Sequence, residues 1–152
     1  MKGVLSMSKE VEVRDVVEVN DEKYTVEIAN PLHGYRTLST YDLIITDLQR
    51  SVSKNSGRNM YVMDVYIVLA CDYDEKTIIA DKRRLYKSGE FQMQEVRDAL
   101  TSVVAQQIAE SGEKILFLTD EILENTLKGK QVTIKADVVR GSNGQLQITL
   151  LF

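Results

Sequence analysis

Alternation between apolar and polar residues runs through most of the chain and is broken by short polar turns. It is clearest on both sides of residues 53–59, whose asparagines and glycine tolerate the positive φ angles of a chain reversal. Tyr41–Val68 is therefore predicted to form a β-hairpin with a basic tip. Tyr66 and Asp64 should lie on a partly open face of the second arm, because strand side chains alternate between two faces. The opposite, apolar face should lie on a core and carries Tyr61, Met63, Val65 and Ile67.

Two further pairs of alternating segments predict hairpins toward the two ends of the chain. Residues 10–19 and 24–28 flank a polar turn in the first part of the sequence. Residues 130–139 and 145–152 flank Gly141–Gly144 in the last part. Each of these hairpins has one face that is mainly apolar and one that is polar, which is typical of a sheet packed on a core through one side.

One long segment changes from strand alternation to helical spacing. Residues 89–111 are predicted to form an α-helix, with Ser88 as its N-cap and Gly112 at the C′ position. The apolar residues recur every three or four positions and form a single stripe, so the helix should pack on a sheet through one face. The stripe consists of Val96, Ala99, Leu100, Val103, Val104 and Ile108.

Two shorter segments border this helix. Before it, Thr77–Ala80 predicts a short strand, and Asp81–Lys87 follows with four basic residues and one aromatic residue. The second segment is suited to phosphate contacts, but a solvated loop or a strand edge protected by charge has the same composition. After the long helix, Glu121–Leu127 predicts a short helix capped by Thr119 or Asp120.

The chain has 152 residues, 43% of them hydrophobic, which suits one domain with a packed core. No apolar run approaches the roughly 20 residues that span a bilayer, and residues 1–8 lack the apolar region of a signal peptide. Cys71 is the single cysteine, so an internal disulfide is excluded. We therefore expect a cytoplasmic protein without a membrane partner.

The net charge of −4 opposes general affinity for nucleic acid, but the charge is unevenly distributed. Residues 89–125 hold two basic and eight acidic side chains, and residues 1–30 hold four and seven. Residues 31–60 hold four basic and two acidic side chains, and residues 126–152 hold four and one. Positive charge is thus concentrated in the central and final strands.

Several kinds of catalytic site are excluded by what the chain contains. A nucleophilic triad or a zinc site needs several histidines or cysteines, whereas His33 and Cys71 are the only ones. His33 is interpreted as a loop residue in the connector Asn30–Gly34. Neither a GxxxxGK[ST] nor a GxGxxG phosphate loop is present. We therefore expect a protein that is not an enzyme and has no cofactor.

One acidic group remains as an alternative. Carboxylate oxygens are the ligands that hold Mg²⁺ in phosphodiester hydrolysis, and four carboxylates come from Asp64, Asp72, Asp74 and Glu75, which Lys76 follows. The last four of these residues lie where a hairpin turn is predicted. We interpret them as a solvated turn and keep the nuclease as a minor alternative.

The order of these segments resembles a known family. A strand with Ile44, Ile45 and Leu48, the tip Lys54–Asn59 and the strand start Met60–Val65 resemble the opening of OB-fold single-stranded DNA-binding proteins encoded by bacteriophages. Those proteins are also similar in their further strands, helix and closing hairpin, which a Leu-x-Gly-Lys signature introduces, here within Leu127–Val132. The resemblance covers Tyr41–Phe152. Two features depart from it, namely the hairpin within residues 1–30 and the lack of an acidic tail, which argues against recruiting replication partners through such a tail.

The fold class expected from the resemblance and the pattern is α+β and mostly β. It is an OB-like small barrel of antiparallel hairpins over residues 41–152, with one amphipathic helix and one short helix, preceded by an N-terminal hairpin extension in residues 1–30. All of it should form a single domain, 1–152.

A site of this kind binds single strands by stacking bases on aromatic rings while basic residues neutralise phosphates. The candidate stacking residues are Tyr61, Tyr66 and Tyr73, and Tyr66 is favoured because it shares a face with Asp64. The candidate phosphate contacts are Arg50, Lys54, Arg58, Lys82, Arg83, Arg84, Lys135 and Arg140. The expected partners are single-stranded DNA, further copies of the chain, and proteins of DNA replication or recombination in a phage or mobile element.

A different class of function stays open. The acidic helix, the net negative charge and the edge strands also suit an interaction protein, such as a virion assembly component or an inhibitor of a host enzyme. Binding to an oligonucleotide, or its absence, distinguishes the two classes.

Overall fold

The computed structural model describes residues 15–19, 22–29, 35, 38–110, 112, 119–127, 131–143 and 145–151. Its strands are β1 (Asp15–Val19), β2 (Glu22–Ile28), β3 (Leu38–Val52), β4 (Asn59–Asp72), β5 (Thr77–Ser88), β6 (Val132–Arg140) and β7 (Leu146–Leu150). Its helices are α2 (Glu90–Glu110) and α3 (Asp120–Leu127). His33 and most of the Leu-x-Gly-Lys signature lie outside the described residues.

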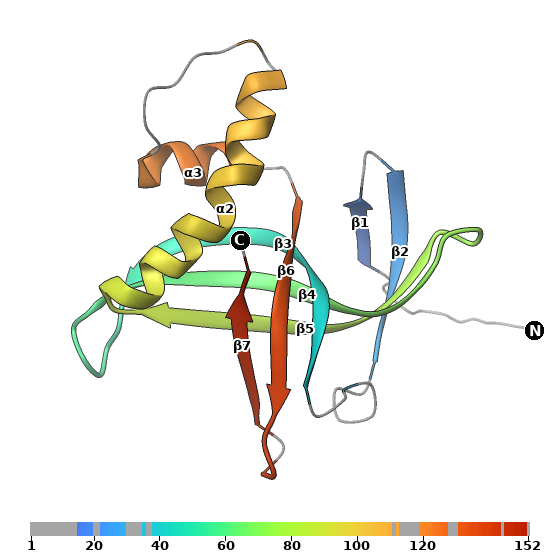
Figure 1. The fold of residues 1–152 in the computed structure, drawn as a ribbon, viewed down its shortest axis with the longest axis horizontal. Helices are drawn as coiled ribbons and strands as arrows, with labels where there is room; N and C mark the ends of the chain where they lie inside the picture. Colours follow the sequence, from blue (N-terminus) through green and yellow to red (C-terminus); the bar gives the residue numbers. More distant parts are fainter. Residues whose placement is uncertain are drawn as a thin grey trace, which may run out of the picture.

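The described strands form one sheet in the order β1-β2-β5-β4-β3-β6-β7 (Figure 1). All neighbours are antiparallel except β2 and β5, which pair in parallel over Thr25–Ile28 and Thr77–Ala80. The mostly β, α+β class is therefore confirmed, but the parallel pair was not predicted. Within the described part of the chain no pairing joins β1 to β7, so the sheet is open and strand pairing does not close it into a barrel.

The central hairpin is confirmed and is longer than predicted. β3 pairs with β4 from Asp42 to Val52, and its first half, Leu38–Ile45, pairs with β6. The register between β3 and β4 shifts between Ile45 and Asp47, where the pairing with β6 ends. Such a shift lets a strand bend, and Figure 1 shows β3 following β6 first and then running with β4 to the tip.

β5 is one strand of 12 residues, although the sequence predicted a strand only for Thr77–Ala80. Asp81–Ser88 continues antiparallel to β4, which is long enough to pair with all of it. The interpretation of residues 81–87 as a loop is therefore wrong. The alternative, a charged strand edge, fits better, because among the described residues the edge of β5 opposite β4 has no strand partner beyond Ala80.

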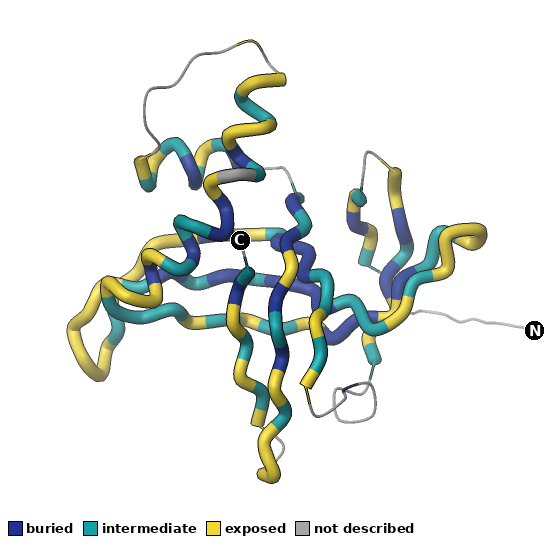
Figure 2. The backbone as a smooth tube through the Cα atoms, viewed as in Figure 1, coloured by how far each residue is buried: buried dark blue, intermediate teal, exposed yellow. Residues whose placement is uncertain are grey.

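Two hydrophobic cores lie on opposite faces of this sheet. Figure 2 shows where the buried residues lie along the strands and helices. The larger core packs α2 and α3 on one face, through the predicted stripe of α2 and the predicted apolar face of β4. The smaller core packs the β1–β2 hairpin on the other face, over Ile44, Tyr66 and Ile78. We call the face that carries α2 and α3 the inner face and the opposite one the outer face.

The helix ends follow from specific residues. The carbonyl of Gly89 accepts the N–H of Met93 at 3.0 Å, so Gly89 is the N-cap, and the prediction of Ser88 is wrong by one position. Gly112 has a φ of 83°, which confirms its C′ position. Thr119 Oγ1 accepts the N–H of Ile122 at 3.2 Å and caps α3. Neither described helix is long and apolar enough to cross a bilayer.

Candidate nucleic-acid interface

The part of the outer face that β1 and β2 leave open is formed by β4 and β5 near the tip. In the antiparallel register Val62 lies opposite Tyr86, and Asp64 lies opposite Arg84. These side chains point away from the larger core because their neighbours on β4, Tyr61 and Met63, are buried in it. We call Met60, Val62, Asp64, Arg84, Tyr86 and Ser88 the open face.

Tyr86 is the exposed aromatic residue of the open face. Its side chain is 60% exposed, in contrast to the fully buried Tyr61 on the other side of the sheet. Arg84 lies two residues away on the same side of β5 and is also exposed. An exposed ring beside a guanidinium is the pairing that stacks a base and contacts its phosphate.

Arg84 is held in place by Asp64 across the strand pair. Its Nε and Nη2 donate to the two carboxylate oxygens at 2.8 and 3.2 Å. These hydrogen bonds lower the pKa of Asp64, which stays ionised at neutral pH. The guanidinium is thus fixed on the open face, with part of its charge already neutralised.

The tip of the β3–β4 hairpin lies at the end of the open face. Two backbone bonds close it, from the N–H of Ser53 to Arg58 O at 2.8 Å and from the N–H of Gly57 to Ser53 O at 2.9 Å. Gly57 has a φ of 70°, as the turn sequence predicted. Lys54 and Arg58 are exposed, and neither forms an ion pair with another described residue.

The start of α2 stabilises the tip from one side. The N–H of Gly89 donates to Asn59 O at 2.9 Å, and the Arg58 side chain passes over Gly89. A Cβ at Gly89 would make only an ordinary contact with Arg58 Cδ, at 3.7 Å, so it is the positive φ of 86° that favours glycine at this position. Beside this contact is an open hollow of about 430 Å³, and Phe91, which is 90% exposed, follows in the first turn of α2.

Tyr66 does not lie on the open face. It is only 5% exposed because the β1–β2 hairpin covers it, so the prediction that it meets solvent is wrong. Its hydroxyl donates to the Asp15 carboxylate, and burial together with this bond raises its pKa. Lys82 Nζ pairs with the same carboxylate at 3.4 Å and lies 5.7 Å from the Tyr66 ring centroid. Asp15 thus binds both Tyr66, the predicted stacking residue, and Lys82, a predicted phosphate contact.

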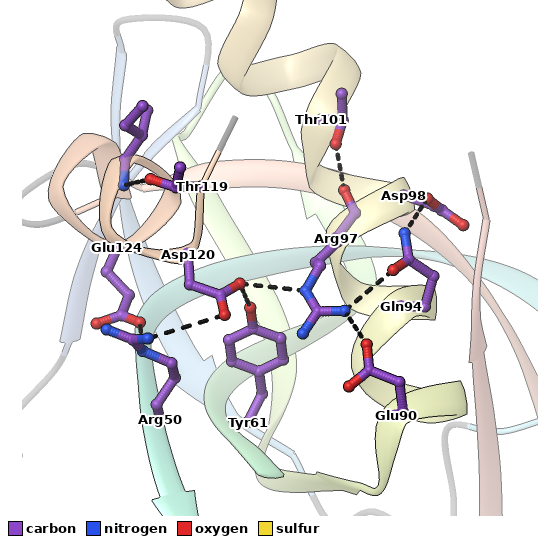
Figure 3. A network of polar contacts seen from close by, with 11 residues as sticks. Arg50, Tyr61, Glu90, Gln94, Arg97, Asp98, Thr101, Thr119, Asp120 and Glu124 are labelled. Carbon is purple, nitrogen blue, oxygen red and sulfur yellow. Dashed lines mark hydrogen bonds and ion pairs between the residues drawn. The ribbon is translucent and has the colours of Figure 1, made fainter. Parts of the chain in front are cut away.

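Tyr61 and Arg50 lie on the inner face, where they hold the helices (Figure 3). The Tyr61 hydroxyl donates to Asp120, which also pairs with Arg97 Nε at 3.1 Å and with Arg50 Nη1 at 3.8 Å. Burial and the Asp120 carboxylate raise the pKa of Tyr61 to about 12. Arg50 also pairs with Glu124 of α3. Both residues join the sheet to α2 and α3, so we no longer place them in the binding site.

The other predicted residues lie elsewhere. Arg83 points inward and pairs at 2.7 Å with the buried Asp81, which also accepts the Tyr35 hydroxyl at 2.8 Å. Tyr73 is exposed in the turn after β4, at the end far from the tip, and Lys135 pairs with Asp42 at 2.5 Å. Arg140 ends β6. Of the predicted residues, only Lys54, Arg58 and Arg84 lie at the tip end of the outer face.

The acidic group suggested for Mg²⁺ is not assembled. Asp64 binds Arg84, whereas Asp72 Oδ1 accepts the N–H groups of Asp74 and Glu75 at 3.0 and 3.1 Å and forms the β4–β5 turn. Within the described residues, no three Asp, Glu, His or Cys side chains are arranged to hold a metal ion. The interpretation of residues 72–76 as a turn is confirmed.

Tyr86 and Phe91 were absent from the predicted stacking residues. Tyr86 lies in the segment 81–87, for which a strand was only one of the interpretations. Once β5 is a strand in register with β4, the spacing Arg84-x-Tyr86 places both side chains on the face of Asp64. The signal was therefore present in the sequence but depended on the register.

Comparison with known proteins finds no family model and no curated protein that matches the chain. The resemblance to phage OB-fold proteins therefore stays a prediction, based on the order of the elements and on the residues that carry it.

Proposed function

We propose that the chain is a non-catalytic single-stranded DNA-binding protein that uses the open face and the tip. The observation that carries the proposal is the exposed Tyr86 beside Arg84, with Lys54 and Arg58, which have no ion-pair partner among the described residues, at the nearby β3–β4 tip. If a base stacks on Tyr86, one of its flanking phosphates would lie near Arg84 and the other would lie near the tip.

The order of the elements supports this choice of surface. An OB fold is a partly open barrel that binds oligonucleotides on the face of its second and third strands and with the loop between its first and second. In the strand series β3, β4, β5, β6 and β7, with α2 after the third, these parts are β4, β5 and the tip. They are the elements that form the candidate interface.

Side chains bridge the place where such a barrel closes. Lys87 of β5 donates through Nζ to Ile148 O of β7 at 2.8 Å and pairs with Glu95 of α2 at 3.1 Å. The carboxylate of Glu95 accepts the N–H of Leu150 at 2.8 Å. Two side chains, Lys87 and Glu95, thus hydrogen-bond to backbone groups of β7 at the place where β5 and β7 would pair in a closed barrel. This supports an OB-like barrel in which side chains replace the strand pairing between β5 and β7.

Binding is expected to be weak and sensitive to salt, because three cations contribute and the chain is anionic. In the biological role that the resemblance implies, replication or recombination of a phage or mobile element, many such contacts would line up along one strand. Lys82 and Lys135, which pair with Asp15 and Asp42 outside the open face, are not part of this site.

Fluorescence anisotropy of a labelled oligo-dT, measured over a range of salt concentrations, tests the proposal. Each phosphate contact on a single strand contributes about 0.7 to the slope of log K against log salt. Replacing Lys54 and Arg58 with glutamine should therefore lower the slope by about 1.4.

Lys135→Gln is the matched control, because Lys135 lies on β6 in an ion pair with Asp42 and should leave the slope unchanged. No binding by the unaltered protein at low salt, or a slope that the tip does not affect, would remove the proposal.

A protein-docking function is the second candidate. It is favoured by the carboxylate partners of Arg50, Lys82, Arg83, Arg84 and Lys135, which account for most of the predicted phosphate contacts. Cations that are already neutralised within the chain attract a polyanion only weakly. A surface that carries both signs of charge is better suited to a protein partner with complementary charges. An oligo-dT that does not bind, combined with self-association, would favour this candidate.

A further inference from the structure

A hollow lies at the end of the β4–β5 pair that is farthest from the tip. It has a volume of about 380 Å³ and is lined by β2, the end of β4, the turn after it and the start of β5. Ala70 and the exposed Ile79 provide an apolar floor. Glu27, Asp72 and Glu75 provide its carboxylates.

The carboxylates of the hollow have no cation partner in the part of the chain that the structure describes. None of Glu27, Asp72 and Glu75 forms an ion pair with another described residue, and Lys76 in the same turn is bound to Glu22 at 2.7 Å. The hydrogen bonds to Asp72 are from backbone N–H groups of the turn. The hollow therefore presents apolar surface surrounded by negative charge.

The tip has the complementary character. Lys54 and Arg58 are exposed and unpaired among the described residues, and Val52 beside them is an exposed apolar side chain. β4 runs from Asn59 at the tip to Asp72 at the hollow. At about 3.3 Å per residue this strand separates the two ends by roughly 40 Å, so the tip cannot reach the hollow of its own chain.

We propose that the tip of one copy docks into the hollow of a second copy. Val52 would cover Ile79, while Lys54 and Arg58 would meet Glu27, Asp72 and Glu75. The contact joins two different surfaces, so a pair of copies keeps one free tip and one free hollow, and repetition builds a chain or a closed ring. A small interface made of exposed charges is weak, and screening by salt weakens it further.

Charge reversal of each surface tests the docking without any oligonucleotide, so its outcome is independent of DNA binding. The tip variant carries Lys54→Glu with Arg58→Glu, and the hollow variant carries Glu27→Lys with Glu75→Lys. In sedimentation velocity at low salt, the unaltered protein should associate more as its concentration rises and should return to a monomer at high salt. Each variant alone should associate at least about tenfold more weakly, because like charges then face each other.

A mixture of equal amounts of the two variants is the decisive sample. The acidic tip of one variant then meets the basic hollow of the other, and the unaltered basic tip of the hollow variant meets the unaltered acidic hollow of the tip variant. Association should therefore return to about the level of the unaltered protein. Restored association also demonstrates that both variants are folded. The proposal is overturned if the unaltered protein stays monomeric at low salt, if the hollow variant associates normally, or if the mixture associates no more than its components.

Discussion

Replacing Tyr86 with alanine should weaken the binding of a labelled oligo-dT by about 5-fold to 150-fold. This range corresponds to the 1 to 3 kcal/mol that one stacked base contributes. Tyr86 is 60% exposed on the open face, where its ring has a free surface and Arg84 lies beside it. The loss should appear in anisotropy titrations at low salt, whereas Tyr86→Phe should keep most of the affinity because its ring still stacks.

Tyr73→Ala is the matched control for this substitution. Tyr73 is 70% exposed, but it lies in the turn after β4 at the opposite end of the strand pair. We expect an unchanged affinity for this variant. Equal losses of affinity for Tyr73→Ala and Tyr86→Ala, or no loss for Tyr86→Ala, would show that the bases of a DNA strand do not stack on the open face.

Replacing Asp120 with alanine should lower the free energy of unfolding by about 2 to 3 kcal/mol. The carboxylate accepts the Tyr61 hydroxyl and pairs with Arg97 and Arg50, so its removal leaves a buried hydroxyl without this acceptor (Figure 3). For a chain of this size the melting temperature should fall by roughly 5 to 10 °C. Thermal and urea denaturation measure both quantities.

Asp98→Ala serves as the control in the same region. Asp98 lies on α2 and accepts the amide of Gln94 at 2.9 Å, without a buried partner. The stability of this variant should change by less than about 0.5 kcal/mol. Asp120→Ala should also leave the oligo-dT affinity of the folded protein unchanged, because Tyr61 and Arg50 lie on the inner face. A stable Asp120→Ala variant that has lost DNA binding would return both residues to the site.

Most secondary structure could be predicted from local pattern. Alternation located the central and final hairpins, and the three-and-four spacing located α2 within one residue at each end. Such patterns are local consequences of burying one face of a strand or helix. The same reasoning assigned the strand face of Tyr61, Met63 and Val65 to a core, as found, although Tyr61 was also named as a stacking residue, which its burial argues against.

The arrangement of the elements in space was harder to predict. The parallel pairing of β2 with β5 joins residues about 50 positions apart in the sequence, and nothing in either strand indicates the other. This pairing brings β1 and β2 over the outer face, where they bury Tyr66. Tyr66 and Asp64 share one strand face, but only the part near Asp64 stays open, and alternation cannot show that difference.

The binding residues were predicted only in part, because charge partners are set by the tertiary structure. Lys82 and Arg84 lie two residues apart on the same face of β5. Lys82 nevertheless pairs with Asp15 of the N-terminal hairpin, whereas Arg84 pairs with Asp64 on the neighbouring strand. The tip was identified because its turn sequence is local and residues 53–59 hold two basic residues and no acidic one. Tyr86 was missed because its exposure depends on the length and register of β5.

Amide chemical shifts of the labelled protein, recorded while unlabelled oligo-dT is added at low salt, test the central claim most directly. We expect the shifts to change at Arg84, Tyr86 and the tip residues Lys54 and Arg58, and to return as salt is raised. The shifts of Tyr73 and Lys135 should stay unaffected. Changes centred on the far end of the strands, or no changes at all, would contradict a single-strand site on the open face.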